Sequence, residues 1–261
     1  MIIIAPGCGL CNRMRAIASA YNLARDNNTW LLVLWRQNSE CNCTFYSLFK
    51  EMPFMRVINC KDKHGKYDWP MLLASKLTSR TFLLQSQEHN SCTDFDNEKD
   101  EIIRLLERKR SIFIATIYPF YNLDNFNMFA PSEAVADGVM KVLKSERKDS
   151  NLIGVHIRRT DNPWSTTNST TELFDAAIER ELTMDPHAKF YLATDSMEED
   201  IHMRQKFGNA ILTNPNRSYG RDIVTGMVDA AIDLCCLSRC KKILGSYQSS
   251  FTDVAAVWGG L

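Results

Sequence analysis

The chain has 261 residues, a length that allows one large domain or two smaller ones. Apolar residues make up 45% and charged residues 24%, as in a globular protein with a buried core. Lys plus Arg and Asp plus Glu number 31 each, so the zero net charge provides no general attraction to nucleic acid or to an anionic membrane. Any basic site must therefore be local.

Short apolar runs alternate with helical stretches along the chain, which is typical of parallel α/β units. In chain order we expect a strand at 1–5, a helix at 12–25, strands at 30–35 and 55–59, a helix at 98–108, a strand at 111–116, a helix at 133–143, a strand at 152–157, a helix at 171–183, a strand at 190–194, a helix at 197–206, a strand at 210–213, a helix at 222–237, a strand at 242–245 and a helix at 250–258. Residues 38–97 are rich in Asn, Cys, Ser and aromatics and give no clear pattern. The polar run 144–151 is the expected linker, so we expect halves at 1–146 and 147–261.

No apolar run approaches the roughly 18 residues that a membrane-spanning helix requires. We expect no transmembrane segment and a cytoplasmic location, with a peripheral position at the inner face of a membrane as an alternative. The nine cysteines are an odd number and cannot all pair within the chain. Cys8 and Cys11 have the spacing of half a zinc site, but no second half follows, so we interpret the cysteines as small apolar residues.

An apolar strand that ends in two adjacent arginines is the sharpest local feature of the sequence, in the run from Gly154 to Asp161. Ligands of open α/β sheets bind beyond the carboxyl ends of the strands, and the planar guanidinium group suits a phosphate. The alternative is a solvated strand end with an arginine paired to Asp161. Because a strand alternates its faces, we expect Arg158 to reach the ligand and Arg159 to brace the loop or a carboxylate.

A glycine-rich segment lies between the first strand and the first helix and contains Gly7, Gly9, Asn12 and Arg13. Glycines permit close approach of the backbone, and a helix N-terminus presents free N–H groups to an anion. The third glycine of a dinucleotide-binding motif is absent, so a simple tight turn is the alternative.

Hydroxyl and carboxylate groups follow the later strands. Ser249 and Ser250 open the last helix, where an anion pocket and ordinary capping are both open interpretations. Asp229 and Asp233 share a helix face, where either could accept guanine N–H groups or simply be solvated. Asp195 follows another strand and could hold a sugar hydroxyl, orient an arginine or cap the next helix.

The triplet from Asp94 to Asp96 has the D-x-D pattern of metal-binding sugar transferases. It lies in the irregular middle of the chain, with no expected strand before it. We therefore interpret it as a chance match and expect no metal site.

Taken in order, these motifs resemble the superfamily of core α1,6-, nodulation, α1,2- and protein O-fucosyltransferases, and lie closest to the core α1,6 and nodulation branch. The middle of the chain, from Cys41 to Asn127, matches nothing in that superfamily. The motifs that carry the resemblance are Gly7 to Met14, His156 to Asp161, Tyr191 to Asp195, Asp233 to Ser238 and Ser246 to Phe251.

The resemblance implies a GT-B-like α/β fold, with two Rossmann-like halves whose parallel sheets face a cleft. It implies a fucosyltransferase that moves fucose from GDP-fucose to a glycan or oligosaccharide acceptor, with inversion and without a metal or other cofactor. By position, Arg158 would hold the β-phosphate, His156 and Asp233 would contact the guanine or ribose side, and Ser249 and Ser250 would contact the phosphates. The implied donor-binding set also contains Gly7, Gly9, Asn12, Arg13, Arg159 and Asp195.

The sequence departs from the core α1,6 enzymes in the loop after the arginine pair, where those enzymes carry a glutamate. Here residues 162–170 contain no carboxylate, which leaves Asp161 and Glu172 as candidate catalytic bases. A base-poor path with oxocarbenium character is an alternative. Transfer of another GDP-sugar, and a non-catalytic protein that binds a nucleotide or phosphosugar, are the other functions that the sequence allows.

Overall fold

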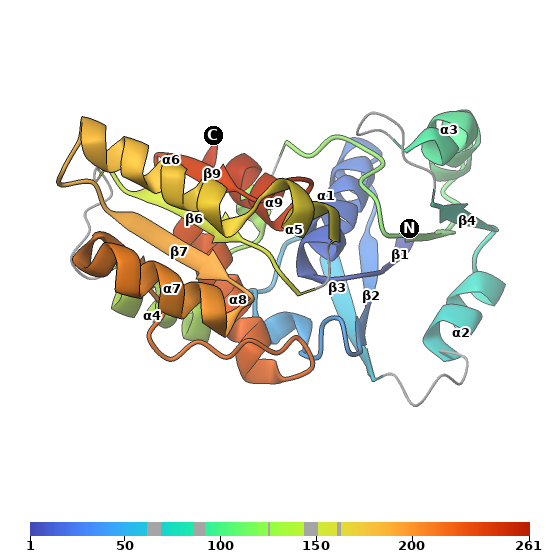
Figure 1. The fold of residues 1–261 in the computed structure, drawn as a ribbon. Coiled ribbons are helices and arrows are strands. Elements are labelled where there is room, and N and C mark those ends of the chain that lie inside the picture. The colour runs from blue at the N-terminus through green and yellow to red at the C-terminus, as the bar shows by residue number, and fades with distance from the viewer. Residues whose placement is uncertain (62–68, 86–91, 125, 144–150, 161–162) are drawn as a thin grey trace. The chain divides into compact units, whose positions relative to one another are not determined.

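The computed structural model describes residues 1–61, 69–85, 92–124, 126–143, 151–160 and 163–261 (Figure 1). The chain forms two compact units, one of residues 1–130 with 221–224, and one of residues 131–220 with 225–261. The first unit therefore ends before the predicted boundary after residue 146. The helix at 133–142 belongs to the second unit, where a Cβ atom on Gly138 would meet Ile232 Cδ1 at 2.2 Å.

The first unit contains a five-stranded sheet in the order β3-β2-β1-β5-β4, and all of its strand pairs are parallel. Its strands are β1 (Ile2–Pro6), β2 (Leu31–Gln37), β3 (Met55–Lys61), β4 (Arg80–Leu84) and β5 (Ile112–Thr116). Its helices are α1 (Leu10–Asp26), α2 (Trp69–Leu77), α3 (Thr93–Glu107) and the 3₁₀ turns Phe45–Ser47 and Phe126–Met128. The chain adds β2 and β3 on one side of β1 and β5 and β4 on the other, so a topological switch point lies between β1 and β5.

The second unit contains a four-stranded parallel sheet in the order β8-β7-β6-β9. Its strands are β6 (Ile153–Ile157), β7 (Phe190–Thr194), β8 (Ile211–Thr213) and β9 (Lys242–Gly245). Its helices are α4 (Glu133–Val142), α5 (Pro163–Asn168), α6 (Thr171–Met184), α7 (Met197–Phe207), α8 (Val224–Leu237), α9 (Ser250–Gly259) and the 3₁₀ turn Gly208–Ala210.

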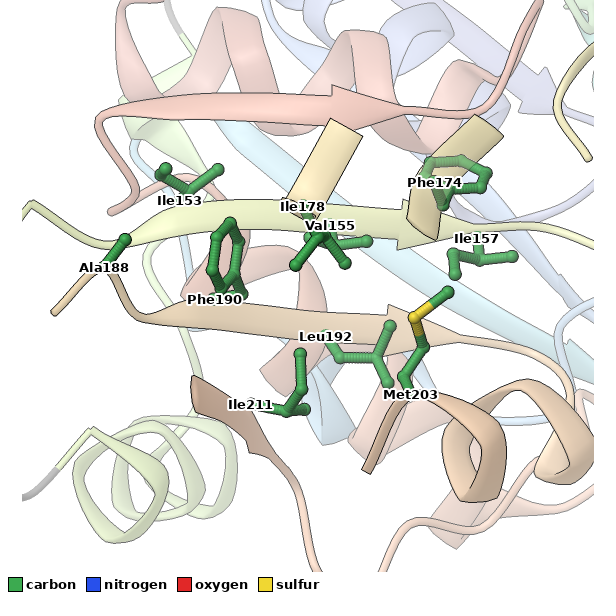
Figure 2. Packing of buried hydrophobic residues seen from close by; sticks show 10 residues of the cluster. All are labelled: Ile153, Val155, Ile157, Phe174, Ile178, Ala188, Phe190, Leu192, Met203 and Ile211. Atoms are coloured by element: carbon green, nitrogen blue, oxygen red, sulfur yellow. The ribbon is translucent and has the colours of Figure 1, made fainter. Parts of the chain in front are cut away.

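Strand β6 is buried on both faces, as expected for a central parallel strand. One face carries Ile153, Val155 and Ile157, which pack in a single cluster with side chains of α6 and α7 (Figure 2). The opposite face carries Gly154 and His156 and is covered by α8 and α9. A Cβ atom on Gly154 would lie 2.9 Å from Leu237 Cδ2, so the glycine allows the end of α8 to approach the strand.

All eight predicted strands are present, with bounds that agree to within two residues. The sequence pattern did not predict α2, β4 or α5, and it placed the start of α3 at residue 98 rather than Thr93. Strand β4 is a sheet edge with a half-exposed pattern, so it lacks the continuous apolar run of the buried strands. Among the described residues, no helix has the length and apolar character needed to cross a bilayer.

Candidate functional site

The carboxyl edge of the second sheet gathers the loops that follow β6, β7 and β9. Arg158 comes directly after β6 and is half-buried. Its backbone N–H donates to Ser246 Oγ at 3.0 Å, and the same hydroxyl donates to the carbonyl of His156 at 3.0 Å. Ser246, which is 4% exposed and follows β9, therefore ties the ends of two adjacent strands together and fixes the backbone of Arg158.

The side chain of Arg159 forms hydrogen bonds with other residues of the protein. Its Nε donates to Glu199 Oε1 at 2.6 Å, one Nη donates to the carbonyl of Ser169 at 2.9 Å, and the other donates to Thr171 Oγ1 at 3.2 Å. These contacts join Arg159 to the residue after α5, to the first residue of α6 and to α7. They match the expected bracing of the loop and of a carboxylate, and the donor-binding role that the resemblance implied for Arg159 stays a prediction.

The Asp195 carboxylate accepts hydrogen bonds from the backbone of the turn that follows β6. One carboxylate oxygen accepts the N–H of Arg159 at 2.7 Å, and the other accepts the hydroxyl of Thr160 at 2.7 Å and its N–H at 3.3 Å. Of the three interpretations of Asp195 left open by the sequence, these contacts favour orientation of the arginine pair.

Helix α9 begins at this edge with a buried hydroxyl. Ser249 is the N-cap residue and is only 1% exposed, and its Oγ has no hydrogen-bond partner in the part of the chain that the structure describes. The first residue of the helix, Ser250, is half-buried. The first-turn N–H groups of a helix have no partner within the helix itself, and together with the buried Ser249 hydroxyl they favour an anion at this position.

His156 packs against the first turn of α9. Its Nδ1 lies 2.8 Å from Thr252 Oγ1, and its ring stacks on Phe251 with a centroid distance of 4.8 Å. Burial lowers the pKa of His156 from its ordinary 6.5 to about 3, so the ring is neutral at physiological pH. The ring thus packs against the first turn of α9, which leaves less of it for the guanine or ribose contact that the resemblance implied.

Asp229 and Asp233, which the sequence suggested for guanine recognition, both hold the segment after β8. Asp229 accepts from Asn214 Nδ2 and from the N–H of Ser218, both at 2.8 Å. Asp233 is 4% exposed and forms an ion pair with Arg217, with 2.8 Å between Nε and Oδ2. Each like-charged carboxylate on this helix face therefore has its own partner.

Tyr191 completes this network by donating its hydroxyl to Asp233 Oδ1 at 2.6 Å. Burial raises the pKa of Asp233, and the adjacent guanidinium of Arg217 opposes that rise. Burial also raises the pKa of Tyr191. The sequence analysis did not identify Arg217, because an arginine in a polar loop carries no local signal of burial.

Arg13 in the first unit is fully buried and holds the glycine-rich segment. Its guanidinium donates to the carbonyl of Cys8 at 2.6 Å, to Asn38 Oδ1 at 2.8 Å and to the carbonyl of Arg36, and it lies 5.0 Å from the ring centre of Trp35. All three nitrogens of Arg13 bond to the chain, which gives the residue a structural role, and the expected donor contact stays a prediction.

The other residues of this segment also contact the chain. Asn12 Oδ1 accepts from Arg15 at 2.8 Å. A Cβ atom on Gly7 would lie 2.7 Å from Ile117 Cγ2, so the glycine is required for packing against the residue after β5. Gly9 is the N-cap of α1 and has an extended backbone conformation.

A pocket of about 200 Å³ lies at the switch point of the first sheet. Residues after β1 and β5, including Gly7 and Ile117, form part of its wall. Arg36, Glu40 and Gln85 provide charged and polar lining groups. The sequence did not indicate these three residues, because none of them belongs to a recognised motif.

Of the two candidate bases, Asp161 lies outside the described residues. Glu172 is fully exposed in the first turn of α6, where a hydrogen bond from Thr170 lowers its pKa. The D-x-D triplet begins α3 rather than following a strand, and Asp94 accepts the backbone N–H of Gln85 at 2.8 Å. Within the described ranges, no group of three or more His, Cys, Asp or Glu residues could hold a metal ion.

The sequence matches no protein-family model and no curated protein. Solved structures do match over nearly the whole chain. NodZ α-1,6-fucosyltransferase, solved from Bradyrhizobium and also soaked with GDP-fucose, gives a TM-score of 0.64 at 16% identity and covers 98% of this chain and 92% of its own. A variant of FUT1 from Arabidopsis thaliana with GDP gives 0.62 at 14% identity and covers 100% and 68%. POFUT1 gives 0.59 at 11% identity and covers 98% and 94%.

These neighbours confirm the predicted fold class and the resemblance at the level of fold. The chain is an α/β protein with two parallel sheets, like the GT-B-like fucosyltransferase structures.

Proposed function

We propose that this chain is an inverting, metal-independent glycosyltransferase that moves fucose from GDP-fucose to a glycan acceptor. The observation that carries the proposal is the buried hydroxyl of Ser249 at the N-terminus of α9, which has no hydrogen-bond partner among the described residues. Strand β9, which leads into that loop, pairs with β6, and Arg158 directly follows β6. The likeness to structures that hold GDP or GDP-fucose adds support for the choice of donor.

The proposed chemistry follows from the charge that develops when GDP departs. Arg158 and the first-turn N–H groups of α9 would stabilise negative charge on the β-phosphate, and the Ser249 hydroxyl would donate to a phosphate oxygen. The Ser246 contact fixes the Arg158 backbone before the donor binds, so little reorganisation is needed. Stabilisation by fixed donors would take the place of a divalent cation.

Inversion requires that the acceptor hydroxyl attack from the side opposite the departing diphosphate. Glu172 or Asp161 would accept its proton. Because the lowered pKa of Glu172 makes it a weak base, we propose a path in which the bond to GDP is largely broken before the proton is removed.

The test measures GDP release from GDP-fucose with a panel of oligosaccharides, with and without EDTA. We expect Arg158→Ala to lower kcat by a factor of about 10² to 10³, which is typical for loss of one transition-state donor. Its melting temperature should stay unchanged. Arg180→Ala, which removes an exposed arginine from α6, should turn over normally.

Each alternative has its own signature in the same experiment. Near-normal turnover of Arg158→Ala would refute the assignment of that residue, and a requirement for added metal would contradict the proposed mechanism. Tight GDP binding without GDP release on any acceptor would favour a nucleotide-binding protein. Release from a different GDP-sugar would change the donor.

A further inference from the structure

Trp164 on α5 is unusually exposed for a tryptophan. Its side chain is 70% exposed, whereas Trp30 is 49% exposed and Trp35 is fully buried. Tryptophan has a large apolar surface and is highly buried on average. A single exposed apolar side chain is ordinary on a protein surface, so the case for ligand contact rests on the position of Trp164 beside the proposed binding edge.

The short helix that carries Trp164 is fixed at several points. Asn168 Nδ2 donates to the carbonyl of Trp164 at 2.8 Å, and Thr166 Oγ1 donates to the carbonyl of Arg159 at 3.4 Å. The Arg159 guanidinium also donates to the carbonyl of Ser169, the residue directly after α5. The exposed indole is thus attached to a braced backbone, which lowers the entropy cost of binding a ligand.

A second exposed aromatic residue is anchored at the same place. The backbone N–H of Tyr247 donates to Ser169 Oγ at 2.9 Å, and the side chain of Tyr247 is 49% exposed. Tyr247 lies in the loop after β9 and Trp164 in the segment after β6, so both come from the carboxyl ends of adjacent strands. Ser169 links the two loops that flank Arg158.

The chemistry of these side chains fits a carbohydrate. A sugar ring presents an apolar C–H face that an indole can cover, and a rim of hydroxyl groups that a carboxylate can bind. The ionised and exposed Glu172, one turn after α5 ends, supplies such a carboxylate. The proposed phosphate site belongs to α9 on the face of β6 that carries His156, whereas α5 leads into α6, which packs on the opposite face. Because the two sites lie on opposite faces of the sheet, an acceptor sugar is favoured over the donor nucleotide as the ligand of Trp164.

We propose that Trp164 stacks on a sugar ring of the glycan acceptor and so helps to determine acceptor specificity. This inference rests on the proposed function, because it takes the acceptor to be a glycan. It adds a specificity residue from a segment with no counterpart among the motifs that carry the resemblance.

The test is a binding measurement that does not depend on catalysis. Labelled protein saturated with GDP is applied to immobilised chitotetraose, cellotetraose, lactose and mannotriose, and the dissociation constant for each bound glycan is measured. We expect Trp164→Ala to raise it about tenfold, as for loss of one good aromatic contact, while GDP affinity measured by calorimetry is unchanged. Trp164→Phe should recover much of the loss.

Trp30→Ala is the matched control, because Trp30 is an exposed tryptophan before β2, at the amino edge of its sheet. It should bind glycan and GDP as the wild type does. Unchanged glycan binding by Trp164→Ala would overturn the proposal, as would weaker GDP binding, which would indicate stacking on guanine. Failure of the wild type to bind any of the four glycans would also overturn it. Failure of the proposed function is a separate result, namely a bound glycan that induces no GDP release.

Discussion

The buried imidazole of His156 makes the stability of the protein depend on pH in a way that can be calculated. Burial lowers its pKa from 6.5 to about 3, whereas the unfolded chain retains the ordinary value. Between these two pH values the unfolded chain binds a proton that the folded chain does not. Above pH 6.5 the titration of His156 therefore costs no unfolding free energy. As the pH falls from 6.5 toward 3, it lowers the unfolding free energy by about 1.4 kcal/mol per pH unit.

Between pH 8 and pH 5, His156 alone should lower the free energy of unfolding by about 2 kcal/mol, because pH 5 lies about 1.5 units below its ordinary pKa of 6.5. We expect His156→Gln, which is neutral and can still bond to Thr252, to lose about 2 kcal/mol less than the wild type over that range. Urea denaturation followed by circular dichroism at each pH gives the two free energies of unfolding. His187→Gln, at an exposed histidine, should keep the wild-type pH profile.

Parallel pH profiles for the wild type and His156→Gln would refute the reasoning. Such a result would mean that the imidazole takes up a proton in the folded protein. The stacking contact with Phe251 and the hydrogen bond to Thr252 would then not exclude water as the structure indicates.

Two further predictions concern packing and charge in the second unit. In Gly245→Ala the new Cβ would lie 2.2 Å from Thr252 Cγ2, so we expect the free energy of unfolding to fall by about 1–3 kcal/mol. The loss should be smaller when Thr252→Ala is also present. Equal losses with and without Thr252→Ala would contradict the predicted clash. Arg217→Ala would leave the buried carboxylate of Asp233 without its positively charged partner, at a cost of about 3–5 kcal/mol, and adding Asp233→Asn should recover much of it. Urea denaturation measures both, and a stable Arg217→Ala single variant would show that the ion pair is dispensable.

The central parallel strands could be predicted because burial on both faces leaves an unmistakable pattern. The run from Ile153 to Ile157 is enclosed by helices on either side, and its sequence is apolar apart from one histidine. Strand β4 could not be predicted in this way. It forms a sheet edge where Arg80 and Leu83 are exposed, so its side chains alternate and its short run resembles a loop.

Positions at strand ends were found from the sequence, whereas side-chain partners were not. The sequence indicated that Arg158 and Ser249 belong to a carboxyl edge, because both follow apolar strand patterns. It did not indicate that Arg13 and Asp233 are engaged with the backbone or with Arg217, because those partners come from distant segments. A charge next to a motif is easily assigned to a ligand when its partner within the chain is unknown.

Residues 221–224 belong to the first unit, although they come after most of the second unit in the sequence. This order has a consequence for biosynthesis. Asn42 bonds to the carbonyl of Arg221 at 3.0 Å through its N–H and to that of Asp222 at 2.6 Å through its side chain. During translation, the first unit lacks this segment until most of the second has left the ribosome. Its assembly therefore cannot be completed while only the N-terminal residues have emerged, and a fragment that stops after Ala130 would lack these two contacts.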